Sequence, residues 1–334
     1  MSAARPEDSA RPQWPERLER DLLDVIADPC RRYWRQVARA DSFGAAQQIR
    51  LPALEGLDRA LANAIRAGYR AARAATEVRI RRDLPARLRR AIGRRPVIHA
   101  AGPARGDAAA QATEILIRRL DQLLIPEDWV EWYAANRVPP LTWALEEKAR
   151  RELAARVATG AAQGLAWHDI KRKLRDTYGL GWAHAENVAR TELGTMYTNG
   201  ALLQYTQTDL VTRVQFMAIL DSRTTPVCAR LNGRVFRVTE ATASVTPPLH
   251  YQCRSTLSPV LAWEDLRPQS PAEAFAGAGP DEYPLEGFGV ADIPEPDPYS
   301  VEELLRPDLA EATGAVRDAL QWLARGATVG WWVR

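Results

Sequence analysis

Cysteine and histidine are rare in this chain, and three of them gather in one segment. The 334 residues include three Cys and four His, and residues 220–258 hold Cys228, His250 and Cys253. Thiolate and imidazole are ligands that Zn²⁺ favours, and the H-x-x-C spacing of His250 and Cys253 lets both bind one ion. Asp221, at the start of a turn upstream, is a candidate for the fourth position. The residue types therefore predict a zinc site formed by Cys228, His250, Cys253 and Asp221.

Two other interpretations of these residues stay open. Cys228 and Cys253 can form a disulfide if the chain meets an oxidising medium, or two thiols and a histidine can simply pack in the core. The paired C-x-x-C knuckles that mark zinc sites most clearly are incomplete here. The sequence also lacks H-E-x-x-H, a Walker A loop and G-x-G-x-x-G, and no catalytic signature surrounds Cys228. We therefore expect no enzymatic activity; the alternative functions are a non-sequence-specific DNA-binding protein and a zinc-dependent hydrolase.

Charged residues flank this cluster and also occur on a helix upstream of it. The predicted helix 182–207 places Glu192, Thr195 and Asn199 on one face, beside Arg190 and Thr191. Polar groups on a packed face need partners. Arginine and carboxylate groups near the cluster can supply them, so we expect a structural network that clamps the helix onto the later loop. Its expected members are Arg190, Glu192, Asp221, Arg223 and Arg254.

Apolar residues repeat at helical spacing along most of the chain, which predicts a mostly α protein of the α+β class. We expect one helix to close at Asp28–Pro29 and another to begin near Pro85. The remaining expected helices cover 111–124, 127–136, 141–163, 168–178, 182–207 and 301–325, with Gly164 and Gly179 as stop signals and residues 96–110 as a loop. Segments 213–220 and 234–238 are typical of strands in a small hairpin, with a turn at Gly233.

The basic residues are concentrated in the first part of the chain. Residues 1–120 contain 24 Arg, no Lys and 14 Asp plus Glu, although the whole chain has a net charge of only +3. A helix with an arginine-rich face can neutralise DNA phosphates without reading sequence; a solvated surface or an acidic partner protein are the alternatives. The candidate contacts with double-stranded DNA are Arg79, Arg81, Arg82, Arg89, Arg90, Arg94 and Arg95.

Several short motifs in the middle of the chain together resemble the phage Mu protein F-like family, the minor head or head morphogenesis proteins of tailed bacteriophages. They are ARTE at 189–192, D-x-R-T at 221–224, Cys228, L-x-G at 231–233 and P-P-x-H-x-x-C-R at 247–254, within residues 145–260. The resemblance adds Thr191, Thr224 and Gly233 to the expected network, because they occupy motif positions. Some relatives have cysteines where this chain has Thr225 and Ser255.

The resemblance implies a virion component inside the head or near the portal, found in the host cytoplasm during assembly. Such a protein binds the portal or capsid and DNA, and assists head assembly or DNA ejection. The expected regions are a flexible N-terminus (1–16), Arg-rich helices (17–140), a Mu-F-like module with the hairpin (141–263), an acidic Pro-rich linker (264–300), and a C-terminal helix and tail (301–334). No apolar run is long enough to span a membrane.

Overall fold

The computed structural model describes residues 14–93, 105–175, 178–293 and 298–328, and it is mostly helical with a small antiparallel sheet. This confirms the predicted fold class. The longer helices are α1 (Glu16–Arg39), α3 (Leu57–Gly93), α4 (Arg105–Leu120), α5 (Glu127–Ala162), α7 (Tyr178–Thr206), α11 (Val301–Glu311) and α12 (Gly314–Thr328). The shorter ones are α2 (Phe43–Gln47), α6 (Trp167–Arg175), α8 (Pro226–Leu231), α9 (Val238–Ser244), α10 (Pro271–Ala274) and the 3-10 turn η2 (Pro280–Glu282).

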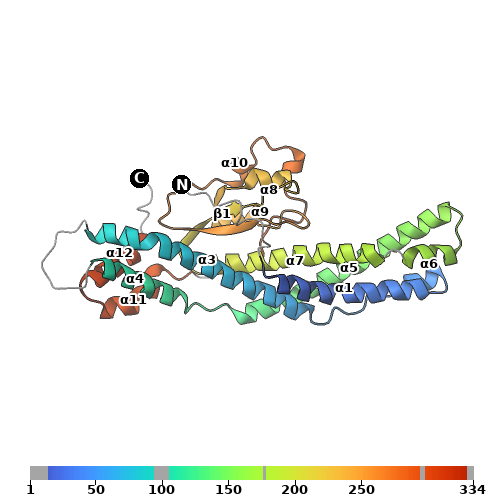
Figure 1. Ribbon diagram of the computed structural model, residues 1–334, viewed down its shortest axis with the longest axis horizontal. Helices are drawn as coiled ribbons and strands as arrows, with labels where there is room; N and C mark the ends of the chain where they lie inside the picture. Colours follow the sequence, from blue (N-terminus) through green and yellow to red (C-terminus); the bar gives the residue numbers. More distant parts are fainter. Residues whose placement is uncertain (1–13, 94–104, 176–177, 294–297, 329–334) are drawn as a thin grey trace.

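The long helices lie side by side along the long axis of the molecule (Figure 1). Two hydrophobic clusters fill the described part, one around α1, α5 and α6 and the other around α4, α11, α12 and the sheet. Helices α3 and α7 contribute to both clusters. They therefore form the spine that joins the two ends of the molecule.

Two glycines set the close approach of α3 and α7. A Cβ atom added at Gly68 would overlap the backbone carbonyl group of Tyr197, and one added at Gly200 would overlap that of Ile65. Glycine is the residue that lets two backbones approach in this way. The crossing of the spine helices thus depends on these two positions.

Several helices are longer than the sequence predicted. Pro29, Pro85 and the Pro139–Pro140 pair lie inside α1, α3 and α5 without ending them, and Gly179 lies inside α7. Proline removes one helical hydrogen bond, but the apolar stripe is buried on both sides of it, as Ile26 and Tyr33 show around Pro29. Packing of the continuous stripe outweighs the local preference, which is why the predicted breaks were wrong.

Two further boundaries also differ from the prediction. Helix α4 begins at Arg105, inside the segment 96–110 that was predicted as a loop. The single helix predicted at 301–325 is two helices, because the chain turns at Gly314, whose φ is +57°. The stop predicted at Gly164 is confirmed, with φ of +70°.

The sheet has three strands in the order β2-β1-β3, with β1 (Val211–Met217) in the centre. β2 (Val235–Arg237) and β3 (Thr256–Leu261) both pair antiparallel with it, in registers that place Val214 opposite Phe236 and Pro259. The predicted hairpin is therefore present, and Gly233 has the positive φ of +80° expected for its turn. β3 was missed, because Pro259 disfavours a strand in sequence terms.

The Pro-rich segment after the sheet packs along the body. Ala274 and Phe275 belong to the hydrophobic core around the sheet, and Glu282 accepts two hydrogen bonds from Arg230 of α8 (2.9 and 2.8 Å). No helix among the described residues is long and apolar enough to cross a membrane. The flexible N-terminus predicted for residues 1–16 falls largely on residues 1–13, which lie outside the described residues.

Candidate metal site and its surroundings

The structure brings three of the four predicted metal ligands together. Cys228, on α8, and Cys253, in the loop before β3, are both buried, and their sulfur atoms are 3.7 Å apart. His250 Nε2 lies 3.3 Å from Cys228 Sγ. The possible ligand atoms of the three residues all lie within 4.8 Å of one another, so this Cys-His-Cys group can hold a metal ion.

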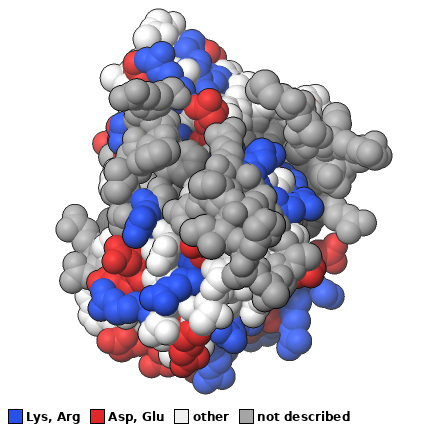
Figure 2. All heavy atoms as spheres, turned by 90° about the vertical axis from the view of Figure 1, so that its left-hand side faces the viewer, with Lys and Arg blue, Asp and Glu red and all other residues white. Residues whose placement is uncertain are grey.

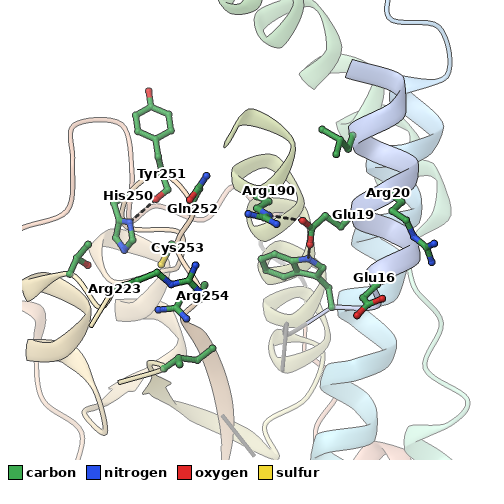
Figure 3. Close-up of a pocket in the computed structure, with 14 residues that line it drawn as sticks. Glu16, Glu19, Arg20, Arg190, Arg223, His250, Tyr251, Gln252, Cys253 and Arg254 are labelled. Atoms are coloured by element: carbon green, nitrogen blue, oxygen red, sulfur yellow. Dashed lines mark hydrogen bonds and ion pairs between the residues drawn. The ribbon is translucent and has the colours of Figure 1, made fainter. Parts of the chain in front are cut away.

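The ring of His250 is oriented by its second nitrogen. Nδ1 lies 2.8 Å from the backbone carbonyl oxygen of Tyr251 (Figure 3) and can donate its proton there. This fixes the tautomer in which Nε2, the atom facing the sulfur of Cys228, carries the free lone pair. Metal-bound histidines commonly have such a carbonyl partner.

The two thiols are not equivalent. A hydrogen bond from Cys228, with smaller contributions from His250, holds the pKa of Cys253 well below its usual value even though burial opposes this. The same hydrogen bond and burial raise the pKa of Cys228. Both cysteines are free thiols in the structure, so the disulfide alternative is not the state described here.

Asp221, the fourth predicted ligand, is not part of the Cys-His-Cys group. Its carboxylate accepts hydrogen bonds from Arg254 Nη1 and Nη2 (2.8 and 2.6 Å), and one oxygen also accepts the backbone N–H of Arg223 (2.9 Å). These contacts hold the pKa of Asp221 well below its usual range. The hydroxyl of Thr224 donates to the carbonyl of Ile219 (2.6 Å) and closes the turn. Asp221 therefore fixes the loop next to the site.

The predicted network has different partners from those expected. Glu192 does not meet Arg223 or Arg254 but accepts two 3.0 Å hydrogen bonds from Arg137 of α5. Arg190 donates to Glu19 of α1 (2.5 Å) and pairs with Glu186 (3.0 Å). The expected pairing of these α7 residues with the loop was wrong, because their charged partners lie on α1, on α5 and on α7 itself.

A smaller set of contacts does join α7 to the loop before β3. The backbone N–H of Gln252 lies 3.3 Å from the hydroxyl oxygen of Thr191, and the Gln252 side chain donates to Asn187. Gln252 has a positive φ of 57°, a conformation that is uncommon outside glycine. The helix and the loop are thus held together by neutral hydrogen bonds rather than by the expected ion pairs.

The rest of the polar face of α7 points into the helical body. Asn199 Nδ2 donates to the hydroxyl of Tyr133 (3.0 Å), and burial raises the pKa of Tyr133 to about 12. Sequence reasoning missed Arg137, the partner of Glu192. Arg137 has no Asp or Glu three or four positions away on its own helix. An arginine without such a neighbour can pair with an acid on another helix, and this was the sequence signal that could have identified it.

Several of the predicted DNA contacts are engaged within the protein. Arg79 is bound by Glu264 (2.7 and 2.9 Å) and Ser258, with only 17% of its side chain exposed. Arg81 pairs with two glutamates and Arg82 with an aspartate, whereas Arg89 and Arg90 are exposed and have no carboxylate partner among the described residues. Arg94 and Arg95 lie outside the described residues.

One end of the molecule carries both positive and negative side chains. It is formed by α4, α11, α12 and the C-terminal part of α3. Figure 2 shows basic side chains, which on these helices are arginines, next to Asp and Glu side chains on this face. One such group is Asp308 of α11, which pairs with Arg118 and Arg119 of α4 (2.8 and 2.5 Å). The excess of arginine in the sequence is therefore partly used to join helices.

The middle of the chain matches the model of a known protein family. Residues 151–258 match the family model described as Phage Mu protein F like protein, which confirms the resemblance. The matched segment, about a third of the chain, contains α7, the first two strands and all three residues of the Cys-His-Cys group. No curated protein and no solved structure gives a significant match.

Proposed function

We propose that this protein is a minor head protein of a tailed-phage virion, which docks on the portal or capsid during head assembly or genome delivery. The observation that carries the proposal is the family match over residues 151–258. That segment includes the part of the chain where α7, the sheet and the Cys-His-Cys loop meet. The role proposed is structural, in the virion and earlier in the host cytoplasm, and it involves no catalytic residues.

We further propose that Cys228, His250 and Cys253 bind one zinc ion. Tetrahedral zinc with Zn–S bonds of about 2.3 Å separates two sulfur ligands by about 3.8 Å, and the two sulfur atoms here are 3.7 Å apart. His250 has the carbonyl partner that orients a ligating imidazole. The donor set and its spacing therefore fit zinc.

The proposed ion would tie together two segments that are distant in sequence. Cys228 lies on α8, whereas His250 and Cys253 lie just before β3, in a loop that Gln252 joins to α7 through neutral hydrogen bonds. A structural zinc ion contributes directly to folding stability. It would hold the docking module rigid, in agreement with a structural role.

The docking proposal is tested by co-expressing the full chain with the portal protein of the same phage and isolating one through a tag on the other. Co-purification at moderate salt is expected. The portal of an unrelated phage serves as the control and should not co-purify. Absence of a complex with both the portal and the major capsid protein of the same phage would contradict the proposal.

Binding to packaged DNA is the finer part of the proposal, and the exposed end of α3 supports it. Arg89 and Arg90 are exposed there without carboxylate partners among the described residues. Arg89→Glu with Arg90→Glu should weaken binding to any duplex and reduce its salt dependence. Arg151→Glu, which reverses an exposed arginine on α5, is the matched control. If gel shifts show the same DNA affinity for the Arg89→Glu, Arg90→Glu variant and for Arg151→Glu, the C-terminal end of α3 does not contact DNA.

A further inference from the structure

A pocket of about 590 Å³ lies between the start of α1, the middle of α7 and the two loops that form the candidate metal site. This volume is in the range of small-molecule sites. His250 and Cys253 line it together with residues of both helices (Figure 3). The proposed docking role does not use this pocket.

The two sides of the pocket differ in charge. The loop side presents Arg223 and Arg254, while the helix side presents Glu16, Glu19, Arg20 and Arg190 (Figure 3). Glu19 is neutralised by Arg190, and Arg254 is held in place by Asp221. The side chain of Arg223 has no ion pair or hydrogen bond within the described ranges of the chain, so its guanidinium is available to a ligand.

A second group on the loop side also lacks a strong hydrogen-bond partner. Thr225 lines the pocket, and its buried hydroxyl has no oxygen or nitrogen partner among the described residues; the group it can donate to is the sulfur of Cys228. A buried hydroxyl bonded only to sulfur is less well satisfied than one bonded to oxygen, because sulfur is a weak acceptor. A ligand oxygen that accepts its hydrogen bond would be a stronger partner.

We propose that the loop side of the pocket binds one compact oxyanion, a phosphate or a carboxylate group, through the guanidinium of Arg223 and the hydroxyl of Thr225, beside Arg254. Guanidinium groups recognise both oxyanions through paired N–H donors. The helix side of the pocket adds no net positive charge that would hold an extended polyanion such as duplex DNA, because Glu16 and Glu19 there are matched by Arg20 and Arg190. The ligand is therefore a single group. Such a ligand would lie against the metal-binding residues His250 and Cys253.

The test is calorimetric titration of the full-length protein with inorganic phosphate and, separately, with acetate, against sodium chloride of equal ionic strength. Arg223→Ala should weaken binding about tenfold or more, because it removes the charged donor. Thr225→Val, which keeps the side-chain shape, should weaken it severalfold. Arg267→Ala is the matched control, since it removes an equally exposed arginine outside the pocket.

Saturable binding of either anion that depends on Arg223 but not on Arg267 supports the proposal, and the anion that binds more tightly identifies the ligand class. Absence of saturable binding of both anions overturns it, as does an equal effect of the two arginine variants. The proposed oxyanion site is formed by pocket residues and does not require the zinc ion. Titration of the chelator-treated protein therefore separates a failure of this proposal from a failure of the metal site.

Discussion

The buried ion pair between Glu192 and Arg137 predicts an unequal response to removal of its two members. Only 9% of the Glu192 side chain is exposed, whereas 39% of the Arg137 side chain is exposed. The two side chains are joined by two hydrogen bonds of 3.0 Å. Arg137→Ala therefore leaves a buried carboxylate without its partner, while Glu192→Ala leaves a guanidinium that water still reaches.

The exposed fractions of the two side chains determine how much free energy of unfolding each variant should lose. Removing one partner of a buried pair costs about 3–5 kcal/mol, and we expect Arg137→Ala to lower the free energy of unfolding by about 3 kcal/mol. Solvent screens the guanidinium left by Glu192→Ala, so that variant should lose only about 1.5 kcal/mol. The double variant should lose less than the sum of the two, because the second substitution removes the group that the first left unpaired.

Urea unfolding followed by circular dichroism measures the free energies of unfolding in this double-mutant cycle. Arg151→Ala is a matched control, since Arg151 forms an exposed pair with Glu147 and should change stability by less than about 0.5 kcal/mol. If Glu192→Ala destabilises the protein as much as Arg137→Ala, or if the two effects are additive, the reasoning from burial is refuted.

Three further outcomes follow from the structure. Thr225→Cys creates a C-x-x-C pair with Cys228 and should raise zinc affinity at least tenfold in a competition titration with a chelator; unchanged affinity would place Thr225 outside the reach of the ion. Gly200→Ala introduces a methyl group where two helix backbones meet, and it should destabilise the protein by about 2 kcal/mol or more in urea unfolding; a neutral effect would show that the crossing can relax. Hydrogen bonds from Arg230 lower the pKa of Glu282 to about 2, so its contribution to stability is present above its unfolded-state pKa and is lost as the pH falls toward 2. The difference in melting temperature between the protein and its Glu282→Gln variant should therefore shrink over that range, and a constant difference would argue against the ion pair.

Much of the secondary structure followed from the spacing of apolar residues, and the errors have a common physical cause. The stripe of Ile80, Leu84 and Leu88 predicted a buried helix face, and all three side chains are fully buried. What could not be predicted was that one unbroken helix, α3, runs through Pro85, because local backbone preference and long-range packing oppose each other there. The packing energy of distant helices is not visible in a local pattern.

Part of the candidate site could also be predicted from the sequence, and part could not. The residue types and the H-x-x-C spacing were enough to predict that His250 and Cys253 lie together, and Cys228 followed from the rarity of cysteine. Glu19 and Arg137, the partners of Arg190 and Glu192 on other helices, were not predictable, because α1 and α5 meet α7 only in three dimensions. Glu186, four residues before Arg190 on α7, was within reach of the helical spacing. Charge complementarity identifies which residues need partners, but it does not select among many candidates in an arginine-rich chain.

We propose that a zinc ion bound by the Cys-His-Cys group holds the docking module together. Elemental analysis of the purified full-length protein, made without added metal, tests this claim most directly. One zinc ion per chain is expected, falling to near zero in Cys253→Ser. A well-folded protein without stoichiometric zinc, or a Cys253→Ser variant that retains the full amount, would contradict it.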